Sequence, residues 1–389
     1  MDRMYFDHAA TTPLDPAVLD VMLPHMRAPF GNPSSVLQMG RQARFAVEES
    51  RERVAACLGA EPGEIVFTSG GTESDNFALK GVFDVSASDR SSHLITSSAE
   101  HEAVLRPAER LQRNGVDVTF LDPGEHGAVT VDQVRETLQP ETKLVSLMHA
   151  NNEIGTLTDI REIAGFCRDH GVLLHCDAVQ TVGLLGVDVN DLGADLVSIS
   201  GHKFYGPKGI GCLYVRGGVD LGSLVEGGSQ ERDRRGGTEN VPAVVGFAEA
   251  LERAVEAAGE RVSHIRSLQE QLIAEIRDRV DPPFVFNTPV DNLDAIAPHI
   301  VNVSFPPVDD APIDGEMLIL NLDMQGVMVS AGSACTSGAM EPSHVLSAIG
   351  RDRPTASAAV RFSIGKDNTA EEVDAAVDAL AETVRRMRR

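Results

Sequence analysis

The sequence has little positive charge. Lysine and arginine number 34 against 58 aspartate and glutamate residues, which gives a formal net charge of −24. This charge repels phosphate groups, so we expect neither a direct nucleic-acid partner nor binding to an anionic membrane. Lysine is the scarcer cation: only five are present, and two of them, Lys203 and Lys208, lie within six residues of each other.

Long apolar runs and paired cysteines are also missing. No run approaches the roughly 20 residues of a membrane span. The first eight residues have neither a basic start nor a long apolar stretch, so we expect no secretory signal and a cytoplasmic location. The five cysteines are scattered and form no CxxC pair, which predicts neither a disulfide framework nor a zinc site. No other metal site is predicted.

The composition that remains is that of a folded protein. Of 389 residues, 42% are hydrophobic and 24% are charged, which argues against a disordered chain. At roughly 150 residues per domain, this length predicts two or three domains. Such a chain can bury a core that needs no metal or disulfide for stability.

Strand and helix patterns alternate up to about residue 215. Strands are predicted at 64–68, 93–96, 116–121, 144–148, 172–176, 196–199 and 211–215. Helices are predicted at 37–58, 73–82, 102–113, 131–138 and 159–170. This alternation predicts an α/β fold in which helices cover both faces of a mostly parallel sheet.

Beyond residue 240 the pattern changes. The predicted elements there are helices at 241–280, broken near Gly259, at 314–325 and at 370–388, and strands at 284–286 and 300–305. We interpret this part as a smaller α+β domain. The predicted division is a large domain at 12–257 and a small domain at 1–11 and 258–389.

A glycine turn joins the first of these strands to the next helix. In Ser69-Gly70-Gly71-Thr72, free backbone N–H groups and the positive end of the helix dipole would together suit a phosphate. The motif is neither a Walker A loop nor GxGxxG. Taken alone, an ordinary turn with Thr72 as N-cap is the simpler interpretation.

Lys203 ends an apolar strand inside the glycine-rich run from Ser200 to Gly211. Burial and the neighbouring His202 would lower the pKa of its amine, as a Schiff-base lysine requires. The alternative is a surface lysine whose stem lies along apolar residues. The scarcity of lysine weakens that alternative.

Other polar residues follow predicted strands. Asp177, His101 and Asn152 would meet at one sheet edge, because ligands of parallel sheets bind at the carboxyl ends of the strands. Asp177 would stabilise a protonated pyridine ring, and Gln180 could reach a ring hydroxyl. His101 could stack on the ring or move a proton. The alternatives are a helix cap for Asp177 and a structural role for His101. Together with Lys203, these positions predict a cofactor cleft.

Cys335 differs from the other four cysteines, which lie in apolar contexts typical of buried packing. Small and polar residues flank it, so we interpret it as an exposed thiol on a mobile loop and a candidate nucleophile. Arg361 lies inside an apolar strand and therefore needs a partner. A substrate carboxylate suits it, and an internal salt bridge is the alternative.

Together these motifs resemble the group I cysteine desulfurases of the NifS/IscS family, which are fold-type I pyridoxal phosphate enzymes. The resemblance runs nearly end to end. The segments that carry it are 5–13, 69–76, the surroundings of His101 and Asn152, 177–180, 200–211, 235–240, the loop of Cys335 and Arg361. The most specific are the runs SGHKFYGPKGIG and GSACTS.

For the cofactor, the resemblance implies pyridoxal 5'-phosphate bonded to Lys203. Asp177 would pair with the pyridine nitrogen, and Gln180 with the ring hydroxyl. His101 would stack on the ring and assist proton transfer. The residues implied to hold the phosphate are Gly71, Thr72, Ser200 and His202, joined by Thr238 from the second subunit of a homodimer.

For the substrate, the resemblance implies L-cysteine. Asn152 and Arg361 would fix its carboxylate, and Cys335 would attack its sulfur. The products would be L-alanine and a persulfide on Cys335. That sulfur would pass to an acceptor protein, such as an iron–sulfur scaffold protein.

Three other functions remain open at this point. An aminotransferase of the same fold would not need Cys335, and a selenocysteine lyase would prefer selenocysteine. A sulfur-carrier scaffold without cofactor would be colourless. The sequence also departs from the family pattern: Ser229, Asp233 and Gly236 stand where the family commonly has Gly, Gly and Ser. None of these departures removes a catalytic group.

Overall fold

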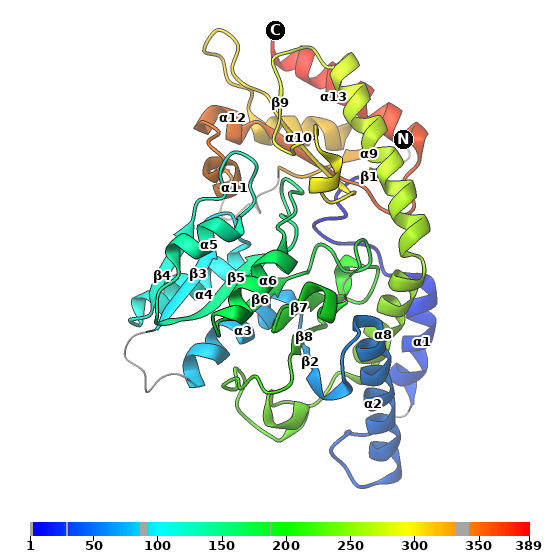
Figure 1. Cartoon of the computed structure of the whole chain (residues 1–389). Helices are drawn as coiled ribbons and strands as arrows, with labels where there is room; N and C mark the ends of the chain where they lie inside the picture. The colour runs from blue at the N-terminus through cyan, green and yellow to red at the C-terminus, as the bar shows by residue number, and fades with distance from the viewer. Residues whose placement is uncertain (1–2, 29, 86–91, 187, 332–341) are drawn as a thin grey trace.

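The computed structural model describes residues 3–28, 30–85, 92–186, 188–331 and 342–389. A large sheet with its helices forms one part of the molecule, and a smaller group of strands and helices beside both chain termini forms the other (Figure 1). The predicted α/β fold class is confirmed. None of the described helices is long and apolar enough to cross a membrane.

The large sheet has seven strands in the order β2-β8-β7-β6-β5-β3-β4. Their bounds are β2 (Ile65–Thr68), β3 (His93–Ser97), β4 (Asp117–Leu121), β5 (Thr142–Met148), β6 (Leu173–Asp177), β7 (Leu196–Ser200) and β8 (Gly211–Val215). Neighbours from β7 to β4 are parallel, whereas β8 is antiparallel to both β2 and β7. The carboxyl ends of the parallel strands therefore share one edge.

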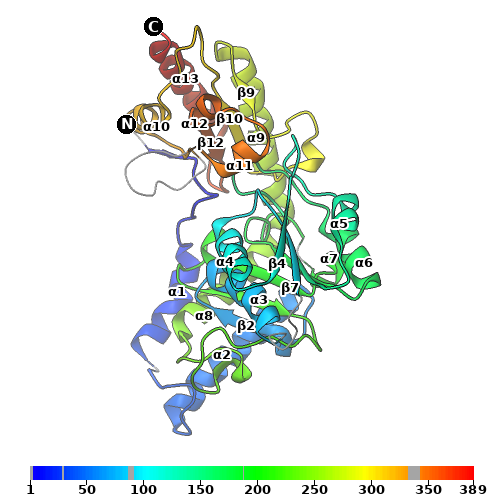
Figure 2. The same cartoon turned by 90° about the vertical axis from the view of Figure 1, so that its left-hand side faces the viewer.

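Helices cover both faces of this sheet, as predicted. One face packs on α3 (Gly71–Val85) and α4 (Glu102–Arg113) through one core cluster. The other face packs on five helices through a second cluster (Figure 2). These are α1 (Pro16–Arg27), α2 (Gln38–Leu58), α5 (Val131–Thr137), α6 (Ile160–Asp169) and α8 (Val241–Glu256), with the short α7 (Val189–Leu192) beside them. Because both faces are buried, the strands read as continuous apolar runs.

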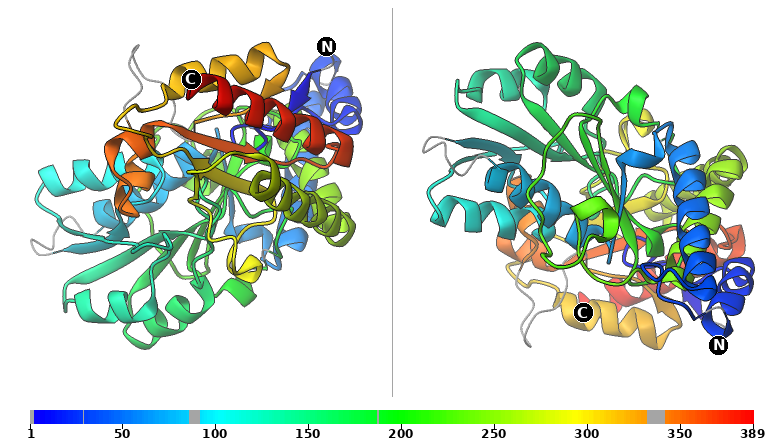
Figure 3. Two further views of the ribbon diagram at one scale, coloured as in Figure 1. Left: turned by 90° about the horizontal axis from the view of Figure 1, so that it is seen from above. Right: turned by 90° about the horizontal axis from the view of Figure 1, so that it is seen from below.

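The smaller part has its own sheet and core. Its antiparallel sheet has the order β12-β10-β9, and the chain start pairs in parallel with a later strand, β1 with β11. The strands are β1 (Met4–Tyr5), β9 (Val285–Phe286), β10 (Ile300–Ser304), β11 (Val327–Met328) and β12 (Ala359–Ser363). The helices are α9 (Ala258–Arg279), α10 (Gly315–Met324), α11 (His344–Ala348), α12 (Arg353–Ser357) and α13 (Ala370–Met387). Figure 3 shows α9 and α13 side by side.

The core of this smaller part is separate from the two clusters of the large sheet. It joins Phe6, from the chain start, to residues between 265 and 384. This separation supports the predicted division at 1–11, 12–257 and 258–389, which stays a proposal.

Local sequence signals explain several element ends. Gly59 ends α2 with φ 68°, a left-handed conformation that glycine adopts without strain. The break predicted near Gly259 lies at Ala257, between α8 and α9. Helix α3 already begins at Gly71, so Thr72 lies inside its first turn and the N-cap interpretation of Thr72 is wrong.

Phe247 of α8 generates a test of this packing. Its ring is fully buried and lies 6.1 Å from the ring of Phe67 and 5.4 Å from that of Phe204, which follows Lys203. We expect Phe247→Ala to lower the free energy of unfolding by about 3–5 kcal/mol, because a large cavity replaces the ring. The control is Val255→Ala on the same helix, where the side chain is 45% exposed. Urea unfolding in which both variants lose equally little stability would contradict the packing described.

Candidate active site

A cavity of about 440 Å³ lies at the carboxyl ends of β5, β6 and β7. Its size is typical of a pocket for a small molecule. Ten of the residues predicted for the site line it: Gly71, Thr72, His101, Asn152, Asp177, Gln180, Ser200, His202, Lys203 and Arg361. The structure therefore brings together residues that the sequence spreads over almost 300 positions.

Lys203 lies in the turn directly after β7, and its amine is held by backbone carbonyls. Nζ donates hydrogen bonds to the carbonyl oxygens of Ala9 and of Ala10, the latter at 3.0 Å. Within the part of the chain that the structure describes, no carboxylate forms an ion pair with this amine. Burial, with a contribution from Arg361, lowers its pKa from 10.5 to about 8. Lys203 is therefore no ordinary surface lysine.

The chain start forms one wall of the cavity. Gln180 Nε2 donates to the Ala9 carbonyl oxygen at 3.0 Å, and Thr12 N donates to the His202 carbonyl oxygen at 3.0 Å. Sequence reasoning assigned no role to Ala9, because a backbone carbonyl leaves no mark in the residue type. The signal available was that residues 5–13 belong to the segments that carry the family resemblance.

The glycine turn before α3 forms an anion cradle. Gly70 has φ 147°, and a Cβ on Gly71 would come within 2.8 Å of the Val179 side chain, so both positions require glycine. Among the described residues, the N–H groups of Gly71, Thr72 and Glu73 have no acceptor. Free N–H groups at a helix N-terminus favour a bound anion.

Ser200 and His202 lie across from this turn. Ser200 ends β7 and lines the cavity. His202 Nδ1 is 3.0 Å from Thr11 Oγ1, and burial, together with Lys203, lowers the pKa of His202 to about 4. The His202 ring is therefore neutral at pH 7, and its role toward an anion is that of a hydrogen-bonding group.

Asp177 ends β6 and is buried close to two other carboxyl groups, those of Asp75 and Glu100. Its Oδ1 accepts the Val179 N–H at 2.9 Å, and the residue also lines the cavity. A turn and not a helix follows Asp177, so the helix-cap interpretation of Asp177 is wrong. Burial raises the pKa of Asp177, whereas His101 and Lys203 oppose that rise. Burial raises the pKa of Asp75 and Glu100 well above the ordinary range, so we expect both to be protonated at pH 7. Of these three groups, Asp177 is the one whose charged form His101 and Lys203 favour.

His101 caps α4 and faces the cavity. Its Nδ1 accepts the Ala103 N–H at 3.1 Å, so the neutral ring carries its proton on Nε2. The ring is exposed to the cavity but surrounded by protein, and this burial lowers its pKa, against the opposing effect of Asp177. The capping role and a functional role therefore coexist.

Arg361 is already paired, as the internal alternative predicted. Nη2 is 2.8 Å from Asp7 Oδ1, and Nη1 donates to the Asn152 carbonyl oxygen at 2.8 Å. Two atoms remain spare at the cavity: Arg361 Nε and Asn152 Oδ1 are buried and have no partner in the described part of the chain. A ligand with both donors and acceptors, such as an amino acid, would satisfy them.

Thr238 is predicted for the site but does not line this cavity. Thr238 lines a separate hollow together with Phe67 and Arg235. Cys335 lies outside the described residues. Of the other cysteines, Cys167, Cys176 and Cys212 are buried, as predicted, whereas Cys57 is half-buried.

Ser343 and His344, which the sequence analysis did not single out, form further contacts beside the cavity. They lie just after residue 341, where the described chain resumes. Ser343 Oγ donates to Glu153 Oε2 at 2.5 Å and also caps α11. His344 Nε2 lies 2.8 Å from the Glu100 carbonyl oxygen. Glu153 and His344 both line the cavity, so the described chain resumes beside the cavity wall.

Comparison with known proteins gives consistent matches over the full length. The family model for aminotransferase class-V matches residues 4–376. A cysteine desulfurase IscS of Dictyoglomus turgidum is 43% identical over 386 residues, 99% of this chain and 95% of that protein. A solved NifS-like protein superposes with a TM-score of 0.89 at 37% identity, over 98% of this chain and 99% of its own. A structure titled SspA in complex with cysteine has a TM-score of 0.80 at 36% identity, over 94% and 99% of the two chains.

The environment of Lys203 generates a pH test on the cofactor-free protein. With a pKa of about 8, about half of the Lys203 amine is neutral at pH 8, against roughly 0.3% for an ordinary lysine. Only the neutral amine reacts with aldehydes. The pH midpoint of formaldehyde labelling, read at Lys203 by mass spectrometry, should therefore lie near 8.

Two variants should move this midpoint in opposite directions. Arg361→Met removes a charge that lowers the pKa of Lys203, so the midpoint should rise. Asp177→Asn removes a charge that raises it, so the midpoint should fall. A midpoint near 10.5 in the unaltered protein, or shifts of the same sign, would show that the electrostatic description is wrong.

Proposed function

This chain belongs to the aminotransferase class-V family and is a cysteine desulfurase, and we propose that it works with pyridoxal 5'-phosphate bound to Lys203 in the cavity described above. The observation that carries the proposal is the convergence of ten separately predicted residues on that one cavity. The relatives are named as cysteine desulfurases. These names support the desulfurase activity and do not support the two alternatives, an aminotransferase and a selenocysteine lyase.

The residues present fit this cofactor at both of its ends. The free N–H groups of Gly71 and Thr72, with Ser200 and His202 across from them, suit a phosphate. A buried carboxylate at Asp177 suits a protonated pyridine nitrogen. Gln180 would reach the ring hydroxyl, and His101 would lie against the ring.

When bound, pyridoxal phosphate supplies an electron sink, which allows the α-proton of L-cysteine to be removed and the bond from Cβ to sulfur to break. The lowered pKa of Lys203 suits its amine for taking and returning that proton near neutral pH. His101 offers a second proton position, because its neutral ring carries a proton on Nε2. As a carboxylate, which His101 and Lys203 favour, Asp177 would stabilise the protonated ring.

Arg361 and Asn152 would hold the substrate. The guanidinium faces the cavity with Nε unused, and the Asn152 side-chain oxygen is also free. The carboxylate of L-cysteine would bind Arg361 in partial exchange for Asp7, and the side-chain amide of Asn152 would help to fix the same carboxylate.

The sulfur acceptor in the enzyme would be Cys335. Its sulfur bonds to the substrate sulfur as the bond from substrate Cβ to sulfur breaks, so L-cysteine and the thiol give L-alanine and a Cys335 persulfide. No other cysteine suits this step, because only a thiolate attacks. Burial raises the pKa of Cys57 to about 11 and of Cys167 to about 12, and burial raises the pKa of Cys176 and of Cys212 further.

The enzyme would act as a homodimer and pass its sulfur to an acceptor such as an iron–sulfur scaffold protein. Large apolar side chains, each more than half exposed, gather between α1 and the first half of α2: Met26, Phe30, Val36, Leu37 and Phe45. Monomers rarely leave such a group open to water. A dimer would cover it, and Thr238, which lies outside its own cavity, would then be available to the second subunit.

Cys335→Ser tests the sulfur step. We expect this variant to lose persulfide and alanine production from L-cysteine while it keeps the bound cofactor and its absorbance. The control is Cys57→Ser, which should retain full turnover because the Cys57 thiol stays protonated. Undiminished alanine release by the Cys335 variant would exclude the proposed nucleophile.

Phe45→Glu tests the dimer. The side chain is 69% exposed, so the monomer should fold, whereas a buried and unpaired charge at an interface costs several kcal/mol. We expect sedimentation to show mainly monomer, with weakened cofactor retention. Met324→Glu on α10, where the side chain is 80% exposed, is the control and should stay dimeric. A Phe45 variant that sediments as the unaltered protein would argue against this surface.

A further inference from the structure

The strand β2 forms the open edge of the large sheet. Among the described strands its only partner is β8, to which it runs antiparallel. In such a pair, alternate residues turn their backbone groups toward the partner strand, and the residues between turn theirs toward the open edge. An open edge leaves N–H and C=O groups unpaired, and natural proteins usually cover it. Two residues after this strand, the chain enters the anion cradle at Gly70.

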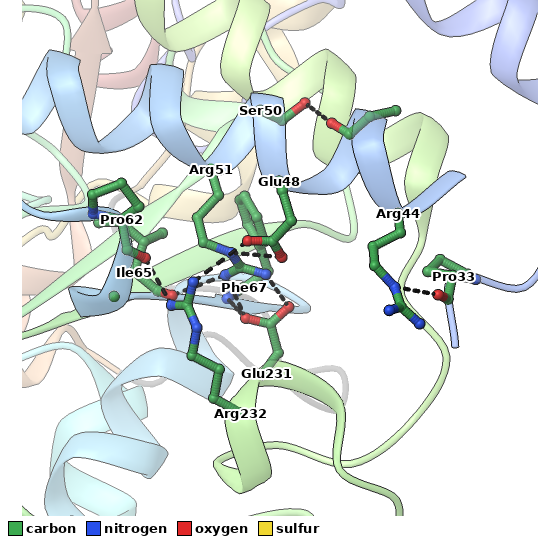
Figure 4. A network of polar contacts seen from close by, with 12 residues as sticks. Pro33, Arg44, Glu48, Ser50, Arg51, Pro62, Ile65, Phe67, Glu231 and Arg232 are labelled. Atoms are coloured by element: carbon green, nitrogen blue, oxygen red, sulfur yellow. Dashed lines mark hydrogen bonds and ion pairs between the residues drawn. The ribbon is translucent and has the colours of Figure 1, made fainter. Parts of the chain in front are cut away.

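A buried ion pair takes the place of the missing neighbour strand (Figure 4). Arg51 Nη1 donates to the Ile65 carbonyl oxygen at 2.9 Å, and Glu231 Oε2 accepts the Phe67 N–H at 3.0 Å. The two side chains also bind each other through two contacts, at 2.7 and 3.0 Å. Each side chain is only 3% exposed. The two side chains therefore neutralise each other and also provide hydrogen-bond partners for two backbone groups on the open edge of β2.

Glu231 begins a strained piece of backbone. Glu231, Arg232 and Asp233 have φ of 47°, 58° and 65°, three successive left-handed residues without a glycine. Asp233 stands where the family commonly has glycine. Such a conformation persists only when its surroundings fix it. The bond from Glu231 to Arg51 and Phe67 is the buried contact that does so.

The segment that contains Glu231 makes a second contact, through Arg235, with the first turn of α3. Arg235 Nε donates to Glu73 Oε1 at 2.8 Å, and Glu73 follows Thr72 in the first turn of α3. Thr238 lies three residues beyond Arg235 and lines a different hollow from the active-site cavity. One rigid unit, β2 with the start of α3, thus holds both the chain's own cradle and the segment that carries Thr238.

We propose that Arg51 and Glu231 are positioning residues for the cofactor: the ion pair seats residues 229–238 so that Thr238 reaches the phosphate in the second subunit. This inference rests on the proposed function, in which Thr238 serves the partner's cavity. It adds that the strength of that contact is set by a buried pair on the outer edge of the sheet, neither member of which lines the active-site cavity.

The test is a double-mutant cycle on the purified holoenzyme, read as the rate at which pyridoxal phosphate is lost after dilution. Glu231→Gln should speed the loss about tenfold, as expected when one hydrogen bond to a charged group is removed. Thr238→Ala should do the same. If Glu231 acts through Thr238, the double variant should lose cofactor no faster than Thr238→Ala alone. Glu48→Gln, which alters an exposed contact of Arg51, is the matched control and should leave the rate unchanged.

The outcomes distinguish a failure of the role proposed for Glu231 from a failure of the role proposed for Thr238. A rate for Glu231→Gln equal to that of the unaltered enzyme, or an additive effect of about a hundredfold in the double variant, would overturn the positioning role. A normal rate for Thr238→Ala would instead overturn the place of Thr238 in the proposed function. If Glu231→Gln does not fold, Arg51→Met with Glu231→Met removes both charges together, and the same cycle with Thr238→Ala applies.

Discussion

The arrangement of the site depends on burying the amine of one lysine without a carboxylate partner. Lys203 keeps its position because the carbonyl oxygens of Ala9 and Ala10 accept from its amine. The start of the chain must therefore pass along the cavity. The parallel pairing of β1 with β11 in the smaller part of the molecule holds it in this position. Asp7 of the same segment binds Arg361, so one stretch of backbone positions both the amine and the guanidinium. This low-dielectric setting is what lowers the pKa of Lys203.

Charge in the site is arranged by environment rather than by the number of ionisable groups. Asp75 and Glu100 lie buried near Asp177, and burial raises the pKa of both well above the ordinary range, which favours their neutral forms. His202 is likewise held neutral by burial. The cavity of a protein with a net charge of −24 thus combines free N–H groups at the start of α3 with the carboxyl group of Asp177 at the end of β6. The overall charge of the chain says little about its active site.

Much of the fold and site follows from the sequence because the relevant physics is local. Strands buried on both faces read as apolar runs, parallel strands share their carboxyl edge, and a glycine turn before a helix predicts an anion cradle. Contacts between distant segments could not be predicted in this way. The bond from Arg361 to Asp7 spans 354 positions and that from Arg51 to Glu231 spans 180. The left-handed backbone at Asp233 leaves no compositional signal, because glycine is absent there.

The central claim is that Lys203 carries the cofactor, and reduction with borohydride tests it most directly. The purified protein should be yellow, and borohydride should bleach it while fixing a pyridoxyl group to the protein. Peptide mapping by mass spectrometry should place that group on Lys203 and leave Lys208, five residues away, unmodified. A colourless protein that binds no pyridoxal phosphate when it is supplied, or a label on Lys208 instead, would contradict the claim.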